Sequence, residues 1–193
     1  MTHFLCALLL GISAVMSWNY SAGARAYAQR HLRFAILLYA GLAGAGIVTS
    51  VSSSELAHLT LAVGLLVSTL APPLLAIAVI GTLARPLNSI WTALGLALTT
   101  LAAMAVTLTG LAVLALIPQI LALVVLTIVA LPAPRGICVR LCLAALALAA
   151  GMLAIVAETP EAGAILSLFS AAGLLGVTRA LVRAGTPSHM VDG

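Results

Sequence analysis

Long apolar segments alternate with short polar gaps along almost the whole chain. Each apolar segment approaches the 20 or so residues that a helix needs to cross a hydrocarbon core about 30 Å thick. The longest polar gap, residues 21–31, is too short for a soluble domain. We therefore expect one polytopic membrane domain over residues 1–193, with a short tail at 184–193. The predicted transmembrane helices are residues 4–20, 32–51, 57–83, 90–108, 111–131, 141–157 and 162–182.

Helix length decides the division between the fourth and fifth segments. Residues 90–131 carry no charge, but as a single helix they would extend about 63 Å, twice the hydrocarbon thickness. The chain is therefore expected to fold back near Thr107, Thr109 and Gly110.

Arginine occupies every second gap and the C-terminal end, whereas the intervening gaps hold Glu55, Glu158 and Glu161. Short loops that contain arginine stay in the cytoplasm, so the alternation predicts an outside N-terminus and a cytoplasmic C-terminus. Arginine also follows the first apolar run instead of preceding it, which favours a retained helix over a cleaved signal peptide. The topology determinants are Arg25, Arg30, Arg33, Arg85, Arg135, Arg140, Arg179 and Arg183.

Composition supports the same class. The chain is 64% hydrophobic and 6% charged, whereas about a quarter of a soluble chain is charged. We expect an all-α integral membrane protein of the bacterial inner (plasma) membrane, in contact with lipid. The net charge of +4 comes from the arginines that set topology, so no nucleic-acid partner is expected.

The predicted helices lack the chemistry of a membrane enzyme. No Asp, Glu, Lys, Arg or His lies near the middle of any of them, and such residues usually persist there for function. We expect no catalysis by the chain alone, no cofactor and no metal site. Cys138 and Cys142 share a helix face, but two thiols make an incomplete metal site. We interpret them as packing residues.

Prolines interrupt two predicted helices. A proline frees the carbonyl four residues before it, and at membrane depth that carbonyl needs a new partner. Two interpretations remain open: a polar or quinone-accessible cavity, or a structural kink satisfied by Ser, Thr or neighbouring helices. The candidate polar helix breaks are Ser68, Thr69, Pro72, Pro73, Pro118 and Gln119.

Pairs of small residues four apart mark three segments and are typical of helices that pack closely in lipid. Because such packing occurs within any bundle, these pairs do not by themselves identify a face for another subunit. They are Ala40 with Gly44, Gly41 with Ala45, Ala147 with Gly151, and Ala172 with Gly176.

Several local features accompany the order of segments. They are Pro73-Leu74 followed by Ala84-Arg85-Pro86, then Arg135, the turn Thr159-Pro160-Glu161, and Arg179 with Arg183. In these features the chain resembles hydrogenase-4 component E, a seven-helix membrane subunit. The last three helices of that family are similar to the small three-helix subunit of respiratory complex I and of multisubunit cation/proton antiporters.

The chain departs from that family at its charged membrane residues. The family carries a glutamate in the sixth helix and charged groups in the third and seventh, thought to serve proton movement. The corresponding regions here read Ala144-Ala145-Leu146, Ser68-Thr69 and about Ser167. The resemblance therefore implies a subunit that has lost the relay and acts as a structural wedge between larger proton-channel and electron-transfer subunits.

The leading hypothesis is a non-catalytic integral membrane subunit that scaffolds other membrane subunits in an energy-converting or cation-transport complex. That complex could be an oxidoreductase. The alternative is a stand-alone carrier or permease for a small neutral or lipophilic solute, with its site at the proline breaks. A sensor or assembly factor is not separated from the first hypothesis by sequence.

Overall fold

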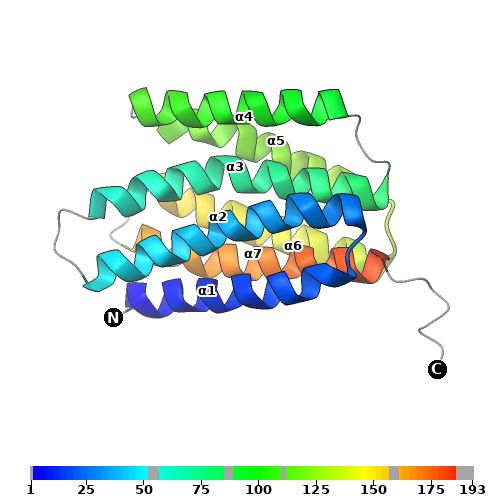
Figure 1. Cartoon of the computed structure of the whole chain (residues 1–193), viewed down its shortest axis with the longest axis horizontal. Coiled ribbons are helices and arrows are strands. Elements are labelled where there is room, and N and C mark those ends of the chain that lie inside the picture. Colours follow the sequence, from blue (N-terminus) through cyan, green and yellow to red (C-terminus); the bar gives the residue numbers. More distant parts are fainter. Residues whose placement is uncertain (1, 52–56, 85–88, 110–111, 157–160, 186–193) are drawn as a thin grey trace.

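The computed structural model describes residues 2–51, 57–84, 89–109, 112–156 and 161–185, and within these ranges the regular secondary structure is helical, with no strand (Figure 1). This confirms the predicted all-α class. A 3₁₀ turn, η1 (Ser21–Gly23), separates the first two helices. The described α-helices are α1 (Thr2–Tyr20), α2 (Ala26–Val51), α3 (Ala57–Leu83), α4 (Ser89–Thr109), α5 (Ala112–Ala130), α6 (Arg135–Val156) and α7 (Ala162–Gly185).

Each predicted segment coincides with one helix, but some ends differ. The second helix begins at Ala26 instead of residue 32, and the sixth at Arg135 instead of residue 141. The apolar pattern marks only the part of a helix suited to hydrocarbon, whereas Gln and Arg propagate a helix well beyond it. The division predicted near Thr107, Thr109 and Gly110 agrees with the end of α4 at Thr109 and the start of α5 at Ala112; residues 110 and 111 lie outside the described ranges.

Two helices form the centre of the bundle. Helix α7 packs against α1, α2, α3 and α6, and α3 packs against α2, α4, α5 and α7. Helix α4 lies at one edge, where it packs mainly on α3 and α5 (Figure 1). Large buried side chains such as Leu32, Leu75 and Leu174 fill the space between the central helices.

Helices α6 and α7 pack closely against each other. A Cβ atom added at Gly173 would lie 2.6 Å from Cγ of Leu148, and one added at Gly176 would lie 2.9 Å from Cβ of Ala144. Both distances are shorter than van der Waals contact. The backbones of α6 and α7 can therefore approach this closely only because Gly173 and Gly176 lack side chains.

Among the described residues, four helices have the length and composition of membrane segments. Four stretches are long and apolar enough to cross a membrane: Thr2–Gly23, Ala26–Val51, Arg135–Ala154 and Ala162–Gly185. The described parts of the other helices contribute the shorter apolar stretches Thr69–Leu83, Thr92–Ala102 and Leu116–Ala130. Large apolar side chains also point outward around the bundle, which suits association with a membrane.

Candidate functional site

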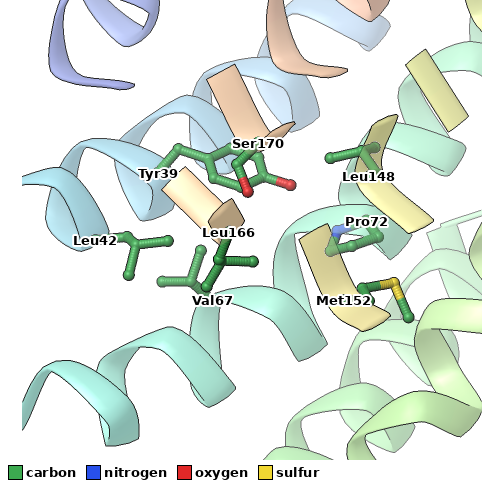
Figure 2. Close-up of a pocket in the computed structure, with 8 residues that line it drawn as sticks. All are labelled: Tyr39, Leu42, Val67, Pro72, Leu148, Met152, Leu166 and Ser170. Atoms are coloured by element: carbon green, nitrogen blue, oxygen red, sulfur yellow. The ribbon is translucent and has the colours of Figure 1, made fainter. Parts of the chain in front are cut away.

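A small cavity lies in the middle of the bundle beside the first proline break. It encloses about 10 Å³ and is bounded by α2, α3, α6 and α7. That volume holds about one water molecule. Figure 2 shows its walls, which are Tyr39, Leu42, Val67, Pro72, Leu148, Met152, Leu166 and Ser170.

Two hydroxyl groups supply the polarity of this cavity. Tyr39 of α2 is 2% exposed and Ser170 of α7 is 3% exposed, and both side chains reach into the space between the helices (Figure 2). Within the described part of the chain, neither hydroxyl has a hydrogen bond to another residue. A buried hydroxyl normally has a partner, and these two hydroxyl-bearing residues line a cavity about the size of one water molecule.

The structure places the residues of the first proline break on one continuous helix. Helix α3 runs through Pro72 and Pro73. Pro72 borders the cavity and Thr69 is fully buried, while Pro73 is half-buried. For Ser68 only the backbone is among the described residues, so its predicted polar role lies outside them.

The second proline break carries a buried carboxamide. Pro118 is half-buried inside α5 and the adjacent Gln119 is 2% exposed. The side-chain oxygen Oε1 of Gln119 has no hydrogen-bond partner among the described residues. An unsatisfied buried acceptor costs about 1–3 kcal/mol. Gln119 does not line the cavity beside Pro72, so the two breaks form separate sites.

The described arginines gather at one end of the bundle, which we call the basic end. Arg25 donates through Nη1 to the carbonyl of Thr82 at 3.2 Å, which joins the start of α2 to the end of α3. The C-terminal end of α7 and the connection between α5 and α6 lie at the same end (Figure 1). Arg85 lies outside the described residues. The arginines of the basic end are Arg25, Arg30, Arg33, Arg135, Arg140, Arg179 and Arg183.

Aromatic side chains hold two of these arginines. The guanidinium of Arg33 lies 4.8 Å from the centroid of the Trp18 ring, and its Nε donates to Oγ of Ser21 at 3.3 Å. Arg179 lies 6.0 Å from the ring of Tyr20. Both contacts join α1 to another helix by cation–π attraction. Glu161, the one acid within the described ranges, immediately precedes α7 at the opposite end, where its carbonyl accepts hydrogen bonds from Ala164 and Ile165.

A face of small residues on α2 points away from the bundle. Ala40, Gly41 and Gly44 are exposed, and no described atom of another helix lies within 4 Å of where a Cβ of either glycine would be. Gly173 and Gly176 on α7 contact α6 instead. The same sequence pattern therefore serves internal packing on α7 and leaves an open face on α2.

An open apolar groove separates α5 from α6. Its volume is about 450 Å³. The hydroxyl of Thr127 donates to the carbonyl of Leu123 at 2.8 Å, which leaves the groove surface almost wholly apolar. The groove is lined by Leu123, Val124, Thr127, Ile128, Cys142, Ala145, Leu146 and Ala149.

Comparison with protein-family models, with curated proteins and with solved structures found no match for the chain. Among the described residues, no three His, Cys, Asp or Glu side chains gather where they could hold a metal ion. Cys138 and Cys142 are free and half-buried.

Sequence reasoning missed the two hydroxyl-bearing residues of the cavity. Tyr39 and Ser170 lie in apolar segments with no neighbouring proline or charge. Their position in the segments could have identified them. Each falls near the middle of a long apolar helix, where a hydroxyl needs a partner within the protein.

Proposed function

We propose that this protein is a non-catalytic integral membrane subunit of a larger energy-converting or cation-transport complex. Its seven helices cross the inner membrane, with the basic end in the cytoplasm and the N-terminus outside. The partners are other integral membrane subunits, held against the outward faces of the bundle. The resemblance to hydrogenase-4 component E suggests the class of complex.

The open face of α2 carries this proposal. Lipid tails are as apolar as leucine, so packing against lipid gives no reason to collect Ala40, Gly41 and Gly44 on one side of a helix. Small residues instead allow another helix to approach the backbone closely. We infer that a transmembrane helix of a neighbouring subunit packs on this face.

Gentle purification tests the assembly. Native membranes are solubilised in a mild detergent, and the tagged chain is resolved by native electrophoresis with identification of the co-migrating proteins. We expect a species much larger than the 19.5 kDa chain that contains other polytopic subunits. Migration of the chain alone, or as a small homo-oligomer, would contradict the proposal.

A matched pair of substitutions tests the face itself. Gly44→Leu fills the open side of α2, so the larger species should be lost while the bundle still folds. Gly95→Leu makes the same change on α4, where likewise nothing lies within 4 Å, and should leave the larger species intact. Equal loss in both variants would show a general effect of leucine and remove the face from the proposal.

Reporter fusions test the proposed orientation. Fusions near Arg25 and after Arg183 should report the cytoplasmic side, and a fusion at Glu161 should report the outside. Short arginine-rich loops resist translocation, so the fusions at the arginines and the fusion at Glu161 should report opposite sides of the membrane. Reporters that place Arg25 and Glu161 on one side of the membrane would overturn the seven-span arrangement.

The carrier hypothesis has one observation in its favour, the unpartnered Oε1 of Gln119. A polar group at a helix break is where carriers bind their solute. The cavity beside Pro72 favours it less, because 10 Å³ is far below the roughly 300 Å³ or more of a usual ligand pocket.

Transport by the purified chain tests this second candidate. The chain alone, reconstituted in liposomes, should take up a small neutral solute, and Gln119→Leu should abolish that uptake. Uptake that survives the substitution would remove Gln119 as the site, and absence of uptake for a panel of neutral solutes would contradict the carrier.

A further inference from the structure

The groove between α5 and α6 fits a membrane lipid. We propose that it binds one anionic phospholipid of the cytoplasmic leaflet, with an acyl chain along the groove and the phosphate at Arg135. The inference rests on the membrane insertion in the proposed function. It does not require a protein partner.

On α5 the groove occupies the half of the helix nearest the basic end, and on α6 it occupies the middle of the helix. Its residues on α5 lie within two turns of the end of that helix at Ala130, and its residues on α6 begin two turns after Arg135. Residues 131–134 connect the helices there. An acyl chain in this groove would therefore carry its headgroup at the basic end.

Arg135 begins the helical stripe that lines the groove. Cys142, Leu146 and Ala149 follow it by 7, 11 and 14 residues, which are whole numbers of helical turns to within about 40° at 3.6 residues per turn. Arg135 is exposed and stands about 10 Å before Cys142 along the axis. Its guanidinium can therefore extend to the headgroup level while the groove stays in the hydrocarbon.

Among the described residues, no acidic side chain neutralises the charge at this end of the groove. Arg135 makes no ion pair with an acid of the described chain, and Glu161 lies at the other end of the bundle. Main-chain N–H groups at the start of α6 add positive potential at the same place. A phosphate diester supplies the missing charge, and anionic headgroups bind basic sites of this kind at the cytoplasmic surface.

The shape of the groove favours an acyl chain over a helix of another subunit. Small residues, Ala145 and Ala149, line it beside the large side chains of Val124, Ile128 and Leu146. A helix about 10 Å across needs small residues on the contact face, as on α2. A flexible acyl chain can instead follow the uneven apolar surface that these residues make.

Native mass spectrometry of the whole chain in detergent tests the proposal, after alkaline extraction has shown that the chain is membrane-embedded. Phosphatidylglycerol and phosphatidylcholine of identical acyl chains are the probes. We expect one molecule of phosphatidylglycerol to bind at least severalfold more tightly than phosphatidylcholine. Equal binding of the two lipids would overturn the role of the phosphate.

Two variants with matched controls locate the site. Arg135→Gln should weaken phosphatidylglycerol binding about fivefold, the effect of one arginine near the surface, and Arg135→Lys should restore most of it. Arg183→Gln removes the same charge at the end of α7 and should have no such effect. Equal weakening by Arg183→Gln would mean that only general charge matters.

Substitutions that block the groove distinguish the contribution of the acyl chain to binding from that of the headgroup. Ala149→Phe should weaken both lipids, whereas Ala172→Phe, at an exposed position of α7, should weaken neither. If Ala149→Phe fails to fold, labelling of Cys142 decides the point. In a Cys6→Ser, Cys138→Ser background, phosphatidylglycerol should slow the reaction of Cys142 with N-cyclohexylmaleimide. Unchanged labelling, or protection of Cys142 by a co-purified protein, would overturn the proposal.

These outcomes are distinguishable from failure of the proposed function. Loss of the larger complex without loss of phosphatidylglycerol binding contradicts only the subunit role. Failure of the chain to remain in the membrane at alkaline pH contradicts both.

Discussion

The hydroxyl of Tyr27 on α2 lies 3.1 Å from Oγ1 of Thr92 on α4, and the two residues are 65 positions apart in sequence. The ring of Tyr27 also lies directly over Gly81 of α3, where any side chain would overlap it. Tyr27 thus touches two other helices at the basic end. This contact attaches the edge helix α4, which otherwise packs mainly on α3 and α5, to the rest of the bundle.

Removing the Tyr27 hydroxyl should therefore loosen α4. Tyr27→Phe keeps the ring on Gly81 and should lower the free energy of unfolding by about 1 kcal/mol, the usual net contribution of one hydrogen bond. Titration of the purified protein from mild detergent into SDS measures it. Tyr20→Phe is the control, because Tyr20 is exposed and meets Arg179 through its ring; a comparable loss there would contradict the assignment.

Close packing of α6 and α7 gives a second prediction. Gly173→Ala places a methyl group against Leu148 and 3.2 Å from the carbonyl of Ala144, so unfolding should become easier by about 1–3 kcal/mol. Gly95→Ala adds the same methyl group in open space on α4 and should stabilise by up to about 1 kcal/mol. Thermal unfolding followed by circular dichroism compares the two variants. A change in stability of the same sign in both would disagree with the structure.

The cavity between Tyr39 and Ser170 predicts coupled effects. If one water joins the two hydroxyls, the second substitution removes little that the first has not already removed. The free energies of unfolding of Tyr39→Phe, Ser170→Ala and the double variant should therefore differ from additivity by at least about 0.5 kcal/mol. Strict additivity in this double-mutant cycle would show that the hydroxyls act independently.

The buried oxygen of Gln119 predicts a gain in stability. Replacing a carboxamide that has an unsatisfied acceptor with an apolar group of similar size removes a desolvation penalty, so Gln119→Leu should stabilise the fold by about 1 kcal/mol or more. Thr127→Val on the same helix loses the hydrogen bond to Leu123 and should not stabilise. A loss of stability in Gln119→Leu would show that the carboxamide has a structural partner.

Much of the architecture was predictable from apolar periodicity and length. The seven helical segments and the division between α4 and α5 both follow from residues close together in sequence. Helix starts at Ala26 and Arg135 were not predicted, because polar residues continue a helix beyond the apolar run.

The sequence by itself determined that this chain forms apolar helices with arginine at one set of ends, because hydrogen bonding and hydrophobicity act within each segment. Tertiary structure alone decided which helices meet. It paired Tyr39 with Ser170 around a cavity, turned Gly173 inward and Gly44 outward, and opened a groove in line with Arg135. The role of each of these residues depends on which face of its helix is covered by other helices. Those helices are distant in sequence, so local sequence does not reveal the covered face.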